Sequence, residues 1–316
     1  MAGANLPAKK YKKTSPTVTR LSFECQGGAT EFIDIGLALS ILNRKFYRAG
    51  LFYYINSVEI YNNEQGVVDF HTLPDNWITK NSWNRGLKLF QKMNALAGPP
   101  LATGMKPKYH DFKVYMSNRH RTAGSLYPSL FDINSAGAVQ NHGTAGEWVY
   151  SEFVSADDDG DATQQADNFN VHMLGNHIGT SDNWTSVGLI QSYARSRATV
   201  ADSSPTIYSD SGLADDPLIN VFDMSSEEQM NDILTNLAED NDQPPYNQDL
   251  YIGQNPQMQH VARIGTEVGA GRVGRASGFC VPFGLLCVDP QEINTAYRVV
   301  INLAPGTYHG VYAERA

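Results

Sequence analysis

Short stretches of alternating apolar and polar side chains recur along this chain of 316 residues, and long loops rich in Gly, Ser and Asn separate them. Such alternation turns one side of a stretch towards a core and the other towards solvent, which is typical of β-strands. About nine or ten stretches fit this pattern, against three or four helical ones. The two kinds do not alternate as in a βαβ array, which disfavours a parallel sheet. We therefore predict an all-β, mainly antiparallel sandwich, a single jelly roll with long loops and a few inserted helices.

The spacing of apolar residues predicts where the individual strands and helices lie in the sequence. The predicted strands are 17–26, 52–61, 67–72, 111–117, 148–154, 169–174, 257–264, 277–288 and 294–303. Of these, 52–61 and 67–72 are expected to form a hairpin. Helices are predicted at 33–50, 77–96 and 225–238, the first ending at Gly50 in a left-handed conformation and the third opening on the capping box Ser225–Glu228. Residues 186–200 are ambiguous, and interior Gly188 favours a strand.

Composition excludes several classes of protein. No apolar run reaches the roughly 18 residues of a membrane span, and no apolar region follows the N-terminal lysines as in a signal peptide. The three cysteines, Cys25, Cys280 and Cys287, are odd in number and lack metal-type spacing, so we interpret them as buried thiols of an intracellular protein. We therefore interpret the match of Asn183–Thr185 to the N-glycosylation sequon as a chance one.

Charge is distributed unevenly. The first twenty residues hold five cations and no acid. The rest of the chain holds the other 19 of the 24 basic residues and all 33 acidic ones, a formal net charge of −14. The expected nucleic-acid-binding residues are Lys9, Lys10, Lys12, Lys13 and Arg20. We predict a disordered basic arm over residues 1–16 and one β-domain over 17–316. A basic arm before an acidic body suits a protein whose N-terminus binds polyanion and whose body packs against its own copies. A solvated tail that only aids solubility is the alternative.

Two loops resemble ligand sites. Residues 269–274 match the dinucleotide fingerprint G-x-G-x-x-G, but the following segment contains Pro282 and is predicted to be a strand, whereas phosphate binding needs a helix N-terminus there. A polyanion contact by neighbouring arginines stays open. Residues Asp157–Asp161 resemble a calcium loop, yet the EF-hand register puts Ser155 and Ala166 where carboxylates are required. A cation site of another kind at this loop stays open, and a solvated acidic loop is the simpler interpretation.

The remaining residues predict no active site, no cofactor and no metal. The eight histidines are scattered and show no metal-ligand spacing, so we interpret them as structural: His71, His110, His120, His142, His172, His177, His260 and His309. The chain contains no G-x-S-x-G nucleophile elbow. Acidic pairs are common but occur on any acidic surface. We therefore predict that the protein is not an enzyme.

Several stretches of the sequence are similar to those of a known family: 33–50 (IDIGLALSILNRKFYRAG), 72–96 (TLPDNWITKNSWNRGLKLFQKMNAL) and 107–117 (PKYHDFKVYMS), and also 215–223 (DDPLINVFD), NDQPPY and GFCVPFGLLCVD. The resemblance is to the capsid proteins of environmental, largely marine, small circular Rep-encoding single-stranded DNA viruses. It implies a jelly-roll coat protein of the virion that self-assembles, with 60 subunits as the expected number, around circular single-stranded DNA. It offers no catalytic residues, and the functional feature that it suggests is the basic arm.

The chain departs from better-known members of that group, whose arms are long and rich in arginine. Five cations on each of about 60 subunits give on the order of 300 charges, which neutralise only part of a genome of thousands of phosphates. Counterions, interior arginines or a partner must supply the rest. The use of Lys9–Lys13 for nuclear import is open, so assembly is expected inside the host cell, with the nucleus as one candidate compartment.

Two other functions compete with a coat protein. Loops rich in Tyr, Trp and Asn, for example around Trp184 and Tyr193, also suit a glycan- or receptor-binding β-sandwich. The outer loops of a coat protein can bind a host receptor or glycan as well, so the two functions are compatible. An enzyme would need a constellation of residues that only the fold brings together.

Overall fold

The computed structural model describes residues 17–97, 109–131, 139–140, 146–155, 167–180, 183–196, 258–267 and 273–315. The chain divides into two compact units, residues 1–193 with 253–316 and residues 194–252. The described sheets all belong to the first unit. The predicted helix 225–238 lies outside the described residues.

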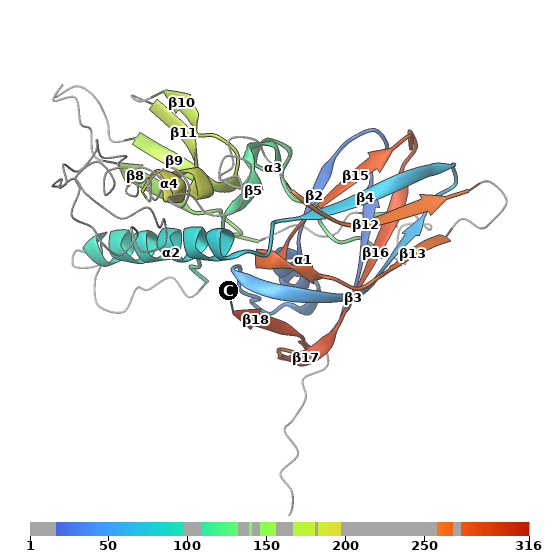
Figure 1. The fold of residues 1–316 in the computed structure, drawn as a ribbon. Helices are drawn as coiled ribbons and strands as arrows, with labels where there is room; N and C mark the ends of the chain where they lie inside the picture. The colour runs from blue at the N-terminus through green and yellow to red at the C-terminus, as the bar shows by residue number, and fades with distance from the viewer. Residues whose placement is uncertain are drawn as a thin grey trace, which may run out of the picture. The chain divides into compact units, whose positions relative to one another are not determined.

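Eight strands form two antiparallel layers, drawn largely in blue and orange in Figure 1. The first sheet has the order β1 (Arg20–Cys25), β16 (Tyr297–Leu303), β3 (Leu51–Tyr61) and β13 (Val273–Ser277). The second has the order β12 (Gln259–Thr266), β4 (Gly66–Thr72), β15 (Leu285–Gln291) and β2 (Glu31–Asp34). Short strands β14 (Cys280–Val281) and β18 (Ala313–Arg315) pair with the other half of β3. β17 (Pro305–Tyr308) precedes the last of these.

The pairing of the eight strands is nested. Counted along the chain, the first pairs with the eighth, the second with the seventh, the third with the sixth and the fourth with the fifth. The contacts of β16 with β3 and of β15 with β4 then join these couples into the two sheets. This is the order of one long hairpin rolled up, as expected of a jelly roll. The predicted mainly antiparallel β-sandwich is confirmed.

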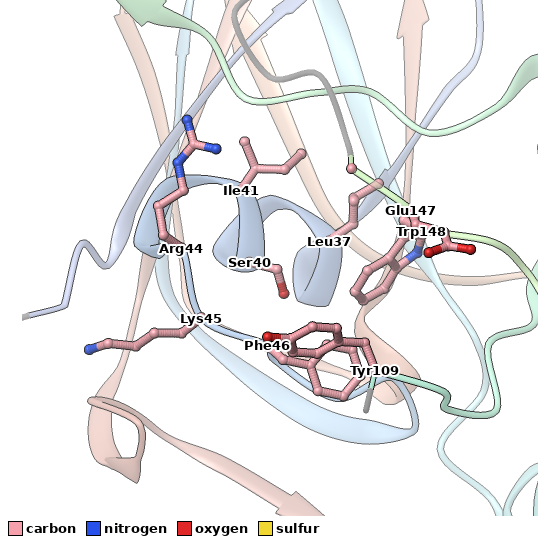
Figure 2. A pocket seen from close by; sticks show the side chains of 10 residues that line it. Leu37, Ser40, Ile41, Arg44, Lys45, Phe46, Tyr109, Glu147 and Trp148 are labelled. Carbon is pink, nitrogen blue, oxygen red and sulfur yellow. The ribbon is translucent and has the colours of Figure 1, made fainter. Parts of the chain in front are cut away.

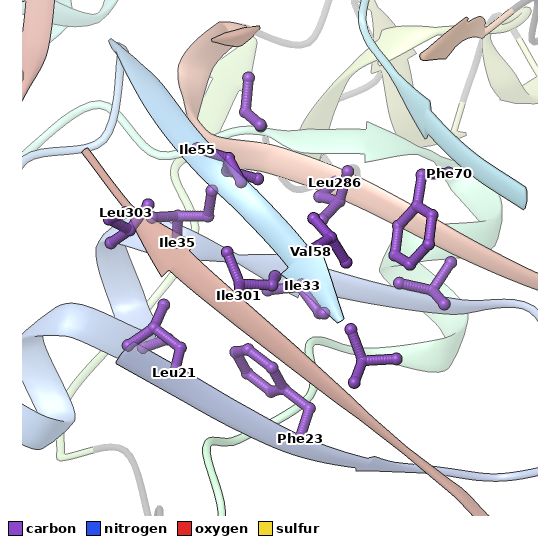
Figure 3. Packing of buried hydrophobic residues seen from close by; sticks show 14 of the residues in the cluster. Leu21, Phe23, Ile33, Ile35, Ile55, Val58, Phe70, Leu286, Ile301 and Leu303 are labelled. Carbon is purple, nitrogen blue, oxygen red and sulfur yellow. The ribbon is translucent and has the colours of Figure 1, made fainter. Parts of the chain in front are cut away.

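The core of the sandwich lies between the two sheets. Along β1, Leu21 and Phe23 are fully buried while Arg20 is exposed, so the strand alternates as its sequence predicts. Figure 3 shows part of this core: Leu21, Phe23, Ile33, Ile35, Ile55, Val58, Phe70, Leu286, Ile301 and Leu303. Each large apolar side chain buried in this way contributes about 1.5–3 kcal/mol to stability.

A long insertion separates the fourth and fifth strands of the sandwich. It contains α2 (Trp77–Ala97), β5 (Tyr115–Ser117), α3 (Asn118–Ala123), β6 (Leu130–Phe131), β7 (Val139–Gln140), β8 (Glu152–Ser155), β9 (Asp167–Leu174), β10 (Ile178–Thr180), β11 (Asn183–Gly188) and α4 (Leu189–Arg195). In its sheet, β9 pairs in parallel with β5 and β11, an exception to the antiparallel prediction.

The insertion has a core of its own. Trp83 and Phe90 of α2 pack with Phe112 and Val171, and Phe32 of β2 joins the same cluster. Successive residues of β15 alternate between the two cores, since Leu286 belongs to the first and Cys287 to the second. The sandwich and the insertion are therefore packed together through the outer face of β15 and β2.

The first predicted helix is shorter than expected. Its first residues form strand β2, and α1 spans only Ile35–Asn43. Asp34 caps the helix, because its Oδ1 accepts from the Leu37 N–H at 3.1 Å. Arg44 ends it in the left-handed conformation, with a φ of 51°. Gly50 is left-handed as predicted, with a φ of 76°, but it lies beyond the end of the helix. The predicted helix 77–96, by contrast, is confirmed as α2.

The predicted hairpin of 52–61 with 67–72 is wrong. These residues do form β3 and β4, but β3 belongs to the first sheet and β4 to the second. The chain crosses from one layer to the other at Asn62, whose side chain donates to the Glu64 carbonyl and to Thr266 of β12. The residues between β3 and β4, whose sequence is typical of a turn, therefore carry the chain from the first sheet to the second.

Two other predictions also need correction. Residues 186–200 were expected to be a strand, but β11 ends at Gly188 and α4 begins at Leu189. A Cβ at Gly188 would lie 2.3 Å from the Gly175 carbonyl oxygen, so this glycine allows a close approach of two backbones. The predicted strand 277–288 is broken at Pro282, which opens the single 3₁₀ turn Pro282–Gly284 between β14 and β15.

Candidate nucleic-acid interface

Lys9, Lys10, Lys12 and Lys13 lie outside the described residues, and Arg20 begins β1 with 60% of its side chain exposed. Its Nη2 lies 3.2 Å from Glu59 Oε2 on β3. Arg20 is thus a strand residue with an acidic partner, which offsets part of the charge that it could offer a polyanion.

The outer face of the first sheet surrounds Arg20 with further charges. Glu59 also accepts from Tyr61 at 3.1 Å and lies 4.0 Å from Arg275 of β13. Arg298 of β16 forms an ion pair with Glu24 of β1. Three arginines and two glutamates therefore share this face and largely neutralise one another.

The start of the described chain is fixed at the end of α1. The Val18 N–H donates to Asn43 Oδ1 at 2.7 Å, and Asn43 Nδ2 returns a bond to the Val18 carbonyl at 3.1 Å. The Thr17 hydroxyl donates to the His309 carbonyl at 2.7 Å. Lys13 precedes Thr17 by only four residues in the sequence. Thr17 and Val18, which follow the predicted arm in the sequence, are therefore held close to the end of α1, where Arg44 follows Asn43.

A pocket of about 270 Å³ opens at this end of α1. Its lining residues come from α1, the turn after it and two segments of the insertion: Leu37, Ser40, Ile41, Arg44, Lys45, Phe46, Tyr109, Gly146, Glu147 and Trp148. Figure 2 shows three aromatic rings in this lining, with Arg44 and Lys45 extending from the helix end. The Phe46 ring lies 5.7 Å from Tyr109 and 6.1 Å from Trp148, measured between centroids. Aromatic rings next to cations are the combination that binds single-stranded nucleic acid.

A buried ammonium lies against two of these rings. Lys113 Nζ is 4.8 Å from the Trp148 ring centroid and 5.7 Å from that of Phe46. Lys113 is 4% exposed, its ammonium donates only to the Tyr109 carbonyl at 3.4 Å, and no carboxylate of the described residues lies within ion-pair distance. Burial lowers the pKa of this ammonium, while Asp111, Asp34 and Glu147 oppose the change. Two cation–π contacts thus hold a buried cation behind the pocket wall.

Hydrogen bonds hold the wall that carries Trp148. The Tyr150 hydroxyl donates to Asp34 Oδ2 at 3.3 Å, next to the cap of α1. The Ser151 N–H donates to the Lys113 carbonyl at 2.9 Å, and Ser151 Oγ accepts from the Lys113 N–H at 3.0 Å. These bonds join residues 148–151 of the insertion to the cap of α1 and to the segment just before β5. The pocket is therefore built between two fixed segments.

Helix α2 carries a second cationic surface, which the sequence prediction missed. The helix contains Lys80, Arg85, Lys88 and Lys92 and no acidic residue. Lys80 pairs with Asp75 at 2.7 Å, but the other three are exposed and their spacing puts them on one face. The signal was present in the sequence, because residues 76–110 hold six Lys or Arg and no acid. The helix prediction for residues 77–96 depends on the apolar stripe alone and does not use these cations.

The other sequence motifs do not form sites in the described part of the chain. Gly269–Arg272 and Asp157–Asp161 lie outside it, and Val273 and Gly274 begin strand β13, not a helix. Within the described ranges, no group of three His, Cys, Asp or Glu side chains could hold a metal ion. No helix found there is long and apolar enough to cross a membrane.

The titratable groups that the structure buries are structural. His120 and His172 are fully buried, and burial lowers their pKa to about 3 and about 4. All three cysteines are unpaired, Cys25 and Cys287 being buried and Cys280 partly exposed. Burial raises the pKa of Cys280 to about 11 and that of Cys287 to about 12, so neither is an activated thiolate.

Comparisons with protein-family models, with curated proteins and with solved structures find no match for this chain. The features of the chain that bear on its function are the strand order, the aromatic pocket at the end of α1 and the basic face of α2.

Proposed function

We propose that this chain is the coat protein of a small single-stranded DNA virus, which assembles with its own copies into a closed shell and holds the genome through its basic N-terminal arm. The protein would reside in the virion and assemble inside the host cell. The observation that carries the proposal is the nested pairing of eight strands directly after a basic arm. The resemblance of 33–50, 72–96 and 107–117 to such coat proteins supports it.

Exposed apolar side chains favour self-association. Leu96 of α2 is 74% exposed and Val149 is 61% exposed, and Leu89 and Val154 are about half exposed. Where such side chains form a continuous patch, a partner commonly covers it, and symmetric copies are the commonest partner. Closed symmetry multiplies weak contacts of this kind into a stable shell.

Cations beyond the arm favour nucleic acid as the content of the shell. Arg44 and Lys45 lie where the arm joins the fold, and Arg85, Lys88 and Lys92 form the basic face of α2. These five cations add to the four lysines of residues 1–16 in each subunit. They address the shortage of positive charge that the short arm leaves.

Light scattering on the purified full-length protein, coupled to size-exclusion chromatography over a range of salt concentrations, tests the proposal. We expect a particle mass corresponding to tens of subunits. A monomer at every concentration and salt condition would rule out a coat protein.

A further inference from the structure

We propose that the pocket at the end of α1 is a subsite for one unpaired nucleotide, whose base contacts the aromatic rings and whose phosphate contacts Arg44 and Lys45. This inference rests on the proposed function, because it names the part of the genome that the coat protein would hold at this place. Its consequence is selectivity for single strands over duplexes.

The rings are arranged for contact with a flat apolar ligand. Phe46, Tyr109 and Trp148 come from three separate segments, and their planes are tilted by 57° and 51° about Phe46. Tyr109 is 57% exposed, so one aromatic ring of the lining faces outwards. An aromatic ring at a surface accepts any base, since every base has a π-face.

The cations of the lining are placed for a phosphate. Arg44 takes the left-handed conformation that ends α1, which directs the chain away from the helix at this residue. Lys45 follows it, and Lys113 adds a buried positive charge behind the rings. Glu147 is the single acid among the ten lining residues. With Arg44, Lys45 and Glu147, the ten lining residues carry a formal net charge of +1, in a chain whose net charge is −9.

The size of the pocket limits the ligand. At about 270 Å³ it is smaller than the range of roughly 300–1,000 Å³ typical of sites that enclose drug-sized ligands. It suits one base at its mouth, with the rest of the strand outside. Bases of a duplex are paired and stacked on one another and cannot enter. The cations alone would bind both kinds of nucleic acid, so the rings must provide the discrimination.

Fluorescence anisotropy of the full-length protein with a labelled oligothymidylate, and with a duplex of equal length at the same salt concentration, tests the subsite. The variant Tyr109→Ser removes the exposed ring. Tyr127→Ser is the matched control, because Tyr127 is 42% exposed and does not line the pocket. We expect Tyr109→Ser to weaken binding of the single strand about fivefold or more, with unchanged duplex binding and an unchanged control.

Equal binding of the single strand by Tyr109→Ser and the wild type would overturn the subsite, as would an equal loss on the duplex. Arg44→Asn tests the phosphate contact without straining the backbone, since Asn tolerates a positive φ. It should weaken binding of both nucleic acids, and an unchanged affinity would remove Arg44 from the subsite.

A second measurement covers the case in which a variant does not fold. The wild-type protein is irradiated with an oligonucleotide that carries 5-iodouracil, and the cross-linked peptides are sequenced. Cross-links at Tyr109 or Trp148 support the subsite, and cross-links found only elsewhere overturn it. Shells that package nucleic acid normally with Tyr109→Ser would remove the subsite and leave the coat function standing. Single-strand binding through Tyr109 by a protein that forms no shell would support the subsite and contradict the coat function.

Discussion

The Tyr150 hydroxyl donates to Asp34 Oδ2 at 3.3 Å, while Asp34 Oδ1 caps α1 by accepting from the Leu37 N–H. The link continues beyond Tyr150. His120 Nδ1 accepts from the Met116 N–H, so its neutral ring donates from Nε2 to Ser125 Oγ at 2.7 Å. The Ser125 hydroxyl then donates to Tyr150 at 2.7 Å. One directed chain of hydrogen bonds thus joins α3, the wall that carries Trp148 and the cap of α1.

Removing one hydroxyl from this chain should destabilise the fold. In Tyr150→Phe, Asp34 and Ser125 each lose a buried partner, so we expect the free energy of unfolding to fall by about 1–3 kcal/mol. Urea unfolding of unassembled protein measures it. Tyr115→Phe is the control, because the Tyr115 ring stacks on Tyr150 at 3.9 Å but its hydroxyl makes no hydrogen bond among the described residues. Equal losses in the two variants would contradict the account.

The protonation of Asp34 should leave a signature in the pH dependence of stability. Burial raises the pKa of this carboxyl to about 6, opposed by the hydrogen bonds from Leu37 and Tyr150. The folded state holds the proton of Asp34 more tightly than the unfolded state. The contribution of this proton to the free energy of unfolding is therefore complete below about pH 4 and is lost as the pH rises through about 6. Asp34→Asn keeps a capping side chain and removes the titration.

The comparison is between Asp34→Asn and the wild type at two pH values. The difference in unfolding free energy should shift in favour of the variant between pH 4 and pH 7, by about 3 kcal/mol for a change of roughly two pKa units. His120 and His172 titrate in both proteins, so their contribution to this difference cancels. A difference that is independent of pH would show that folding does not raise the pKa of Asp34.

The sequence predicted the strands better than their partners. The alternation in 52–61 and 67–72 locates β3 and β4 within a residue, because alternation depends only on which side of each strand is buried. It does not reveal that the partners of β3 are β16 and β13, more than 200 residues away. The hairpin prediction failed because pairing between strands distant in sequence depends on the packing of the whole sandwich.

The candidate site could be predicted only in part. Charge counting found Lys9–Lys13, and it would have found the acid-free residues 76–110 had it been applied to every segment. The pocket could not be found in this way, since Phe46, Tyr109 and Trp148 are brought together by tertiary contacts. The helix end at Arg44 was missed because a non-glycine residue takes the left-handed conformation there.

The basic face of α2 should contribute to the salt dependence of binding. Each cation that contacts a single strand adds about 0.7 to the slope of log affinity against log salt. Replacing both Lys88 and Lys92 by Gln should therefore reduce the slope by about 1.4 if both contact phosphates. Binding of oligothymidylate at several salt concentrations measures it. Arg315→Gln, at the end of β18, is the control, and an unchanged slope in the double variant would exclude this face.

Deletion of residues 1–16 should separate folding from packaging. Among the described residues, the sandwich core begins at Leu21, so the truncated protein should unfold at the same urea concentration as the full chain. Loss of Lys9, Lys10, Lys12 and Lys13 should lower the amount of nucleic acid in each particle. Failure to fold, or normal packaging, would show that the arm does not have the proposed role.

The most direct test of the coat function is negative-stain electron microscopy of the purified full-length protein, with absorbance at 260 and 280 nm measured on the same fraction. We expect uniform closed shells and a raised ratio of absorbance at 260 nm to that at 280 nm, from nucleic acid inside them. Small particles without nucleic acid at every salt concentration and pH would contradict it.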